Sequence, residues 1–507
     1  MKKMQLITSL LLIAFLFTGF IIRYKSTVPK VFTEANLESH MLPLADASVK
    51  ISHVPDSQYY KLKETKIYKT YPLYLPGREP EGYYEQLKGL NPEIAFDQNQ
   101  LKTEQDWIKA GELVYEWGLD VDPFDSLQLQ DYQHDFEKFN MPVTKDGIVP
   151  FFKVVIREKG KLEITGRSCN TCHTKVMPDG GILKGGQGNY PFDQSFGNSI
   201  RSALINPSVP DTMKTHIGQR FSGNLFGAYW MESPAQQRMR IISNDDFIAT
   251  LENTYGGVMH RHGTVLGSPT SIPDLYNLKE RKYLDHTGLV QNKGLVDIML
   301  YATLNEEADR MDKYNGTTVI RRWPSEDKSI YQRFSRFSDA QLYALAQFLT
   351  SLEAPKSPEK FSEDELKQGE RLFAEQGCVS CHTPPLYTNN ALTPVDGFEV
   401  PKEHKAKYNV FDISVGTDPT LALESRRGTG YYKIPSLIGV WNRQALLHNG
   451  SIRSLEELLN AARLKDDYQP KGFFPAWKKV GPVLGHPFGL DLAENDKKAL
   501  ISYLKSL

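Results

Sequence analysis

Residues 167–175 read Arg-Ser-Cys-Asn-Thr-Cys-His-Thr-Lys, with two cysteines three positions apart and a histidine directly after the second. This spacing is typical of the attachment site of a c-type haem. The two thiols bond to the two vinyl groups of one porphyrin, and the histidine then lies under the ring as an axial ligand of the iron. The sequence therefore predicts that Cys169, Cys172 and His173 hold a haem, and it leaves the opposite face of that iron undecided.

The same pattern returns at residues 378–382, which read Cys-Val-Ser-Cys-His. A Cys-x-x-Cys pair can also be a redox dithiol or half of a zinc site, but neither needs a histidine directly after the second cysteine. The chain has four cysteines, and the two motifs use all of them. We therefore expect two covalently bound c haems, the second held by Cys378, Cys381 and His382, and no disulfide.

Composition places the chain among ordinary globular proteins. It has 507 residues, of which 40% are hydrophobic and 24% are charged, with a net charge of -1. This length is enough for two or three domains. The near-neutral balance gives no reason to expect a nucleic acid as a partner.

The first 22 residues predict a route out of the cytoplasm. They begin with Met-Lys-Lys and continue as a long apolar run up to Arg23, which is typical of an export signal. No small-x-small cleavage site follows the run, and its length nearly spans a bilayer, so a signal peptide and an uncleaved N-terminal membrane anchor both remain open. Because bacteria attach haem c outside the cytoplasmic membrane, we expect a periplasmic protein, free or anchored to the inner membrane, or a secreted one.

Four segments recur in the same order along the chain, which indicates an internal duplication. They are a helix start with the pattern Asp-x-[Ile/Leu]-Lys-x-Gly-Glu at 106–115 and 364–373, a haem motif, a segment running from Ile-Pro to His-x-Gly at 272–288 and 434–450, and a closing amphipathic helix at 344–352 and 499–507.

The repeat predicts a mainly α fold with two cytochrome c-like haem domains. We place the first domain at residues 103–352, where two long insertions with extended loops expand it, and the second at residues 361–507. A Pro- and charge-rich linker joins them. Residues 23–102 form an N-terminal extension whose role the sequence does not reveal.

The second half resembles a known family. Residues 369–373 (Gly-Glu-Arg-Leu-Phe), 377–388 (Gly-Cys-Val-Ser-Cys-His-Thr-Pro-Pro-Leu-Tyr-Thr), 433–437 (Lys-Ile-Pro-Ser-Leu) and 448–457 (His-Asn-Gly-Ser-Ile-Arg-Ser-Leu-Glu-Glu) are similar to the bacterial dihaem cytochrome c peroxidase superfamily. That superfamily also contains the amine-dehydrogenase maturation enzyme MauG and the rubber oxygenases. The resemblance covers roughly residues 103–507, and residues 485–490 (Gly-His-Pro-Phe-Gly-Leu) look closest to the rubber-oxygenase-like branch.

The second iron needs a sixth ligand that differs from the usual one. The resemblance implies a methionine shortly after the His-x-Gly turn, but the chain has no methionine beyond Met311. We expect His486 to take that place, as the resemblance also implies, with His448 as the alternative. His404 lies in a charged run, where we expect a solvated loop. Bis-histidine ligation would make this haem low-spin and closed to small ligands.

The first iron is expected to keep an open face. Peroxidases of the superfamily bring a histidine to it soon after the motif, but residues 174–215 contain none. Peroxide or dioxygen could then bind there. His260 and His262 could act as acid and base if either lies over the iron, although a surface or supporting role is equally compatible with the sequence.

Other residues remain as weaker candidates at the two haems. His216 also falls in inserted sequence, and Met177 and Met213 are rival ligands of the first iron that could equally be packing residues. Arg281 and Arg443 occupy the same position of the repeat. An arginine beside each haem could hold a propionate by two hydrogen bonds, whereas a surface arginine kept by common descent is the alternative.

Two classes of function follow. The first is a redox enzyme in which the first haem activates peroxide or dioxygen and the second supports it. A peroxidase would take electrons from a small donor protein, whereas an oxygenase would act on an apolar organic substrate. The second class is a plain electron-transfer cytochrome with both irons six-coordinate.

Overall fold

The computed structural model describes residues 28–507 except 119, 125, 167, 220, 222–225, 229, 261–262 and 319–334. The expected signal or anchor at residues 1–22 lies outside the described residues. Within the described part, no helix is long and apolar enough to cross a membrane. The prediction of a mainly helical chain is confirmed, although short strands accompany the helices throughout.

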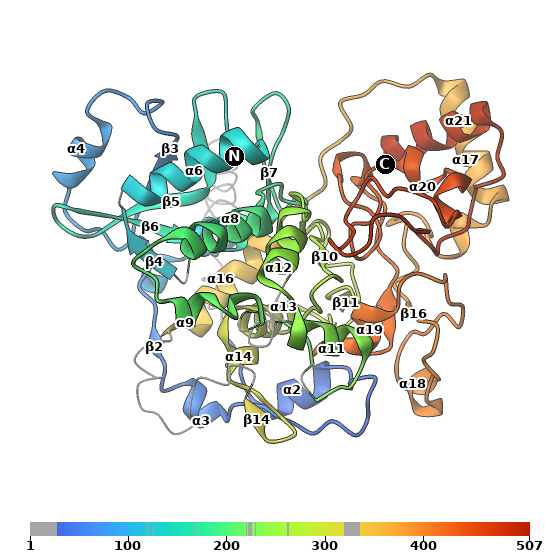
Figure 1. The fold of residues 1–507 in the computed structure, drawn as a ribbon, viewed down its shortest axis with the longest axis horizontal. Helices are drawn as coiled ribbons and strands as arrows, with labels where there is room; N and C mark the ends of the chain where they lie inside the picture. Colours follow the sequence, from blue (N-terminus) through green and yellow to red (C-terminus); the bar gives the residue numbers. More distant parts are fainter. Residues whose placement is uncertain are drawn as a thin grey trace, which may run out of the picture.

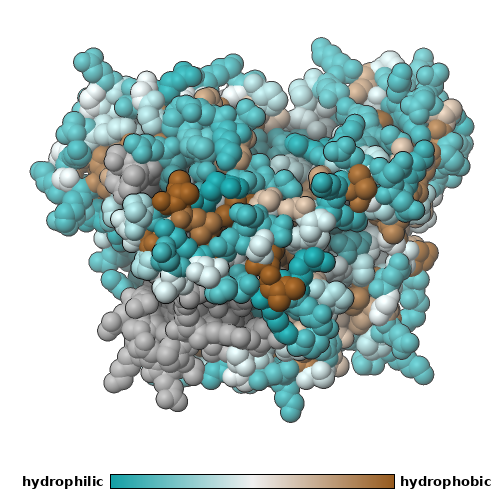
Figure 2. All heavy atoms as spheres, viewed as in Figure 1, coloured by the Kyte–Doolittle hydropathy of each residue, from teal (hydrophilic) through white to brown (hydrophobic). Residues whose placement is uncertain are grey.

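Figure 1 shows a larger lobe that contains α6 to α16 and a smaller lobe that contains α17, α20 and α21. The linker that follows α16 joins the two lobes at the top of the view. Figure 2 shows a largely hydrophilic face with small separate apolar patches, and its upper outline is indented between the lobes.

Each lobe contains one pair of packed helices built from the repeated segments. In the larger lobe α5 (Glu104–Glu116) packs on α16 (Asp339–Thr350), and in the smaller lobe α17 (Glu363–Glu375) packs on α21 (Glu494–Ser506). Helices α5, α17 and α21 bury one apolar face, whereas α16 is buried almost all round. Ser338 and Ser362 cap α16 and α17 through side-chain oxygens.

Glycines at matching positions let the helices of each pair approach closely. A Cβ on Gly111 would lie 1.9 Å from the carbonyl oxygen of Ala344, and a Cβ on Gly369 would lie 2.2 Å from that of Ala499. Gly111 and Gly369 occupy the same place in the repeat, and so do Ala344 and Ala499. No residue with a side chain fits either crossing without moving a helix.

We expect Gly111→Ala to lower the free energy of unfolding by about 1–3 kcal/mol, the usual cost of overpacking. The higher helix propensity of alanine alone would raise the free energy of unfolding by about 1 kcal/mol. A net loss would therefore show that the added methyl group prevents the close packing of α5 on α16. Chemical denaturation of the haem-loaded protein measures the change. Gly294→Ala is the control, because nothing lies within 4 Å of a Cβ added there. Equal effects of the two substitutions would contradict the close crossing.

The first insertion, roughly residues 118–165, supplies three strands of a four-stranded sheet, which a helix-dominated fold did not predict. The antiparallel strands have the order β3 (Thr70–Tyr74), β5 (Ile148–Glu158), β6 (Lys161–Gly166) and β4 (Asp120–Pro123), and β3 comes from the N-terminal extension. The long strand β5 reads Ile-Val-Pro-Phe-Phe-Lys-Val-Val-Ile-Arg-Glu and is buried along most of its length. β-Branched and aromatic residues favour such a strand.

The second insertion, roughly residues 185–260, is helical. Its helices include α8 (Phe192–Ile205), α9 (Asp211–Lys214), α11 (Pro234–Ile241) and α12 (Asn244–Glu252), and α13 (Leu295–Thr303) follows it. α12 packs on α8, while α13 packs on α16. Directly after α13, residues Leu304–Ala308 form one turn of π-helix.

The N-terminal extension pairs with strands of the first half at three places. Strand β3 belongs to the four-stranded sheet, β1 (Ile51–Ser52) pairs with β13 (Lys313–Tyr314), and β2 (Lys63–Glu64) pairs in parallel with β15 (Ser335–Arg336). Two histidine–carboxylate contacts also join the extension to the first half: His40 contacts Asp297, and His53 contacts Asp312.

The His53 contact predicts a pH-dependent part of the stability. Burial acts to lower the pKa of His53, but the hydrogen bond at 2.9 Å and the charge of Asp312 outweigh it, so the pKa is raised above 6.5. A raised pKa means that the contribution is complete below about pH 6.5 and is lost as the pH rises through the raised value. The melting temperature of His53→Gln should therefore fall less between mildly acidic and mildly basic buffer than that of the parent protein. The exposed His216 provides the control, since His216→Gln should keep the parental pH dependence.

Candidate functional site

The first haem motif is anchored on the sheet. It forms the short helix α7 (Cys169–His173), which begins at Ser168, and the side chains of Ser168 and Thr171 cap its first turn. Thr171 Oγ1 donates to the carbonyl of Phe151 in β5 at 3.0 Å, and Asn170 Nδ2 donates to that of Pro150. The two residues between the cysteines therefore hold the motif in place, and the cysteine side chains take no part in these bonds.

The histidine of the first motif is oriented by a backbone carbonyl. His173 Nδ1 lies 3.0 Å from the carbonyl oxygen of Pro273. A hydrogen bond from Nδ1–H fixes the ring tautomer and leaves Nε2 as the nitrogen that can bind a metal.

The second motif has the same arrangement. It forms a 3₁₀ turn, η3 (Cys378–Ser380), that begins after Gly377 in the left-handed region (φ 75°). His382 Nδ1 lies 3.1 Å from the carbonyl oxygen of Tyr387, and the carbonyl of Pro435 also faces this ring. Burial lowers the pKa of His382 to about 4, so the ring is neutral near physiological pH, as a metal ligand must be.

Pro273 and Pro435 are the same residue of the repeat, in the Ile-Pro step of each half. Each motif histidine is therefore faced by a carbonyl from the same step. The backbone further along agrees as well: Asp285 and Leu447, which precede the repeated histidines, have φ values of 68° and 59°. Positive φ is uncommon for residues other than glycine, so its recurrence at one repeat position is specific.

His486 lies opposite His382. The centroids of the two rings are 6.4 Å apart, which leaves room for one metal ion with a metal–nitrogen bond of about 2 Å on each side. Burial lowers the pKa of His486 to about 4, so this ring is neutral too. Its Nδ1 is buried and has no hydrogen-bond partner within the described part of the chain. The pair fits the two axial positions of a haem iron.

A buried arginine holds the loop that carries His486. Arg463 is fully buried, and its guanidinium donates to the carbonyls of Gly485 and His486 at 2.8 and 2.9 Å, and also to that of Val483. His486 itself has φ 50°, and its N–H donates to the carbonyl of Val415 at 2.7 Å. The sequence analysis missed Arg463, because nothing in its local sequence distinguishes it.

The other histidines of the second half lie in different surroundings. His448 stacks on Tyr432 with a centroid distance of 4.2 Å, and its Nε2 is buried and has no hydrogen-bond partner among the described residues, so the ring itself is not saturated. His404 was expected in a solvated loop, but it is 8% exposed and its Nδ1 lies 2.9 Å from the hydroxyl of Tyr431. The prediction of a solvated loop at His404 was wrong, because α18 (Lys402–Lys407) turns this one side chain inward.

Arg281 is buried and Arg443 is partly buried, and both contact one carboxylate. Arg281 Nη2 contacts Asp274 Oδ1, and Arg443 Nη2 lies 2.7 Å from Asp274 Oδ2. Asp274 directly follows Pro273, the residue whose carbonyl faces His173. Arg443 Nη2 also donates to the carbonyl of Ser436, the residue after Pro435, at 2.7 Å. A chain of contacts thus joins the two motif histidines.

This cluster carries more positive than negative charge. Lys433 lies within its field, and burial lowers the pKa of Lys433 to about 8. Burial alone would raise the pKa of Asp274, but the charges of Arg281 and Arg443 lower it to about 2. Asp274 is therefore ionised, and its single negative charge faces two guanidinium groups. Arg281 Nε and Arg443 Nε are buried and have no hydrogen-bond partner among the described residues. Such unfilled donors fit the propionates of a haem.

The candidate ligands and distal residues of the first iron lie in different surroundings. His260 is bonded at both nitrogens, because Nδ1 lies 2.7 Å from Asp193 Oδ2 and Nε2 accepts from the N–H of Gly267 at 3.0 Å. His262 and the side chain of Met213 lie outside the described residues. His216 is exposed, and Met177 lines a cleft that contains no residue of either haem motif. His260 could exchange a proton only by giving up one of its bonds.

No three His, Cys, Asp or Glu side chains gather as a metal site in the described ranges. No family model matches the sequence, and no curated protein matches it. Among solved structures, hydrazine synthase of Kuenenia stuttgartiensis matches 61% of this chain and 92% of its own, with 15% identity and a TM-score of 0.29. A MauG-like protein associated with microbial copper homeostasis matches 60% of this chain and 90% of its own, with 16% identity and a TM-score of 0.28. Scores this low do not establish a shared fold.

Proposed function

We propose that this chain is an exported oxidoreductase with two covalently bound c haems, built from two homologous halves. Three matched features support the duplication: the close glycine crossings at Gly111 and Gly369, the prolyl carbonyls that face the motif histidines, and the positive φ values before the repeated histidines. The four cysteines with their following histidines would hold the haems, and Arg281 and Arg443 would hold propionates.

The main support for the proposal is that the two candidate haem sites differ in the residues available as a sixth ligand. The second motif histidine faces His486 at a distance that suits one iron between them, which would close that iron to small ligands. For the first site, the sequence supplies no histidine soon after the motif, His216 is exposed and His260 is fully bonded. We therefore assign small-molecule chemistry to the first haem.

A haem with an open face supplies binding and activation of peroxide or dioxygen when it is present. The chain's own residues do the rest. The carbonyls of Pro273 and Tyr387 hold the two Nδ1 protons and orient the rings, and Arg463 holds the loop of His486. Asp274 and Arg443 connect the two candidate haem sites within the protein interior, and a haem held at the second site would supply electron transfer to the first.

Within this class we favour the branch of the superfamily that contains the rubber oxygenases. The support is the resemblance of residues 485–490 and the placement of His486 in that turn. The substrate would then be an apolar organic molecule, and the protein would work in the periplasm, anchored or free, or outside the cell. A peroxidase with a small donor protein is the second form of the proposal. A plain electron-transfer cytochrome is the competing function.

Low-temperature EPR of the oxidised, haem-loaded protein tests the inequality directly. We expect one low-spin signal that ignores cyanide and one signal that cyanide changes. Two low-spin signals that are both indifferent to cyanide would favour the electron carrier. Turnover of peroxide with a reduced donor, or products from polyisoprene without a donor, would then separate the peroxidase from the oxygenase.

A further inference from the structure

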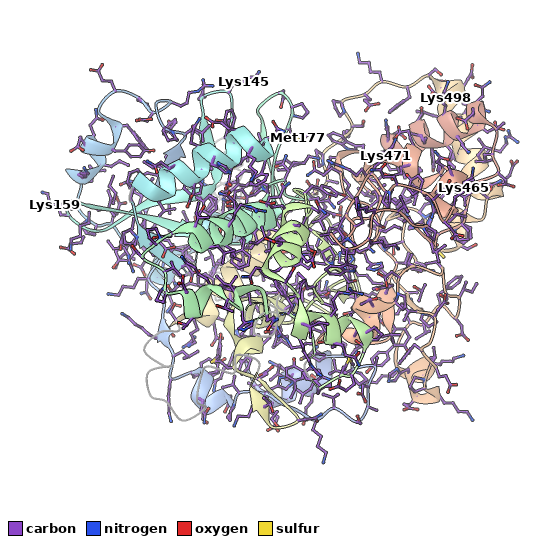
Figure 3. All side chains as sticks on the ribbon, in the orientation of Figure 1. Lys145, Lys159, Met177, Lys465, Lys471 and Lys498 are labelled. Atoms are coloured by element: carbon purple, nitrogen blue, oxygen red, sulfur yellow. The ribbon has the colours of Figure 1, made fainter. Side chains whose placement is uncertain are left out.

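A cleft of about 640 Å³ lies between the two lobes and contains no residue of either haem motif. Its walls come from the loop before β5, from residues 175–180 after the first motif, from the linker at Pro358 and Glu359, and from residues 441–444 of the second half. Figure 3 labels Met177 on the larger lobe where it meets the smaller one, with Lys145 on the upper edge. The volume suits a small-molecule site.

Two polar side chains of the cleft are buried, one without a hydrogen-bond partner and one without a counter-charge among the described residues. Asn442 is 2% exposed, and neither its Oδ1 nor its Nδ2 has a hydrogen-bond partner among the described residues. Lys175 is 8% exposed; its Nζ donates to the backbone carbonyl of Asn442, and no carboxylate of the described chain pairs with it. Leaving a buried amide without a hydrogen-bond partner and a buried ammonium without a counter-charge is costly, so these groups indicate a ligand with negatively charged oxygen acceptors.

The other polar groups in the cleft wall already have partners. Asn189 bonds to the N–H and carbonyl of Val176, and Gln444 Nε2 donates to the carbonyl of Gly256. At the rim, Lys145 and Glu359 bring one charge of each sign. The interior charge is therefore that of Lys175, which favours an anion.

The rest of the wall is apolar and partly flat. It consists of Trp441, Met177, Val143, Val176 and three prolines. The indole of Trp441 is held in place because its Nε1 donates to the carbonyl of Pro355 at 3.1 Å. A fixed aromatic side chain favours a flat, apolar partner.

We propose that this cleft binds a small organic carboxylate with a flat, apolar body, whose oxygen atoms accept hydrogen bonds from Lys175 Nζ and Asn442 Nδ2. The inference goes beyond the proposed haem chemistry and does not depend on it, since the site contains no haem-motif residue.

Calorimetric titration of the haem-loaded protein with benzoate tests the proposal. We expect saturable binding that does not move the Soret band, and no comparable binding of the uncharged analogue benzyl alcohol. Lys175→Met and Asn442→Leu should each weaken benzoate binding at least tenfold, a loss of about 1.4 kcal/mol or more. Lys145→Met, at the rim, should weaken it less than threefold.

Three results would overturn the proposal: no saturable binding, an equal loss in Lys145→Met and Lys175→Met, or a Soret shift that follows the titration and so places benzoate on an iron. If Lys175→Met does not fold, Asn442→Leu decides alone, because leucine has nearly the same volume and removes only the amide. None of these readouts uses turnover, so they remain separate from the test of the redox function.

Discussion

Replacing His486 by alanine is expected to abolish the low-spin signal of the second haem and to make both irons respond to cyanide. The ring of His486 faces that of His382 at 6.4 Å, and both rings are neutral because burial lowers their pKa values to about 4. Without the imidazole, one axial position opens in a site that already excludes bulk water. The change should be nearly complete, because no methionine lies beyond Met311 to replace the ligand.

EPR and the visible spectrum of the haem-loaded variant measure this change. His404→Gln is the matched control, since His404 is a buried histidine of the same half that bonds to Tyr431. It should keep the parental low-spin signal. If His486→Ala keeps that signal while His448→Gln loses it, the ligand is His448 and the assignment of His486 is wrong.

Replacing Asp274 by asparagine is expected to lower the free energy of unfolding by about 3–5 kcal/mol, the usual loss when one partner of a buried ion pair is removed. Among the described residues, Asp274 is the carboxylate that both Arg281 and Arg443 contact, and Lys433 lies near. Its pKa of about 2 means that the charge is present at all working pH values. The variant would leave buried cations uncompensated.

The same substitution should shift the midpoint potentials of both haems to more positive values. A negative charge stabilises the oxidised, more positive iron, so its removal favours reduction. Denaturation and spectroelectrochemistry of the haem-loaded protein measure the two effects. Ser436→Ala is the control, because Ser436 holds the matching place in the second half and its Oγ bonds to backbone groups, donating to the carbonyl of Leu386 and accepting from the N–H of Ile438. It should cost about 1 kcal/mol and leave both potentials in place. A shift of a single potential by Asp274→Asn would contradict a contact shared by the two sites.

The chemistry of the two motifs was predictable because it is local. The Cys-x-x-Cys-His motif consists of residues at fixed separations in the sequence, so it can be identified without a structure. The repeated Ile-Pro and His-x-Gly segments likewise identify the matching parts of the two halves. The helices at residues 104–116 and 494–506 were also predictable, since their apolar residues recur at helical spacing. Whether His486 binds the iron stays a prediction, although the structure places it opposite His382.

Other features depend on contacts between distant residues. Strand β5 is buried along most of its length, so it has no alternating pattern and reads as an apolar run inside an insertion. Arg463 lies more than 20 residues from His486, and Asp274 meets Arg443 across the two halves. Charge or hydropathy along the sequence does not reveal such partners, because only the folded chain brings them together.

The pairing of the N-terminal extension with strands far along the chain also affects the order in which this protein folds. Strand β1 pairs with Tyr314, and the N–H of Val54 donates to a carboxylate 258 residues further along the chain. Contacts with such large sequence separation form late, because the loop between them must close first. The extension therefore takes its final place only after the segment around Asp312 and Tyr314 has folded, although it precedes that segment in the sequence.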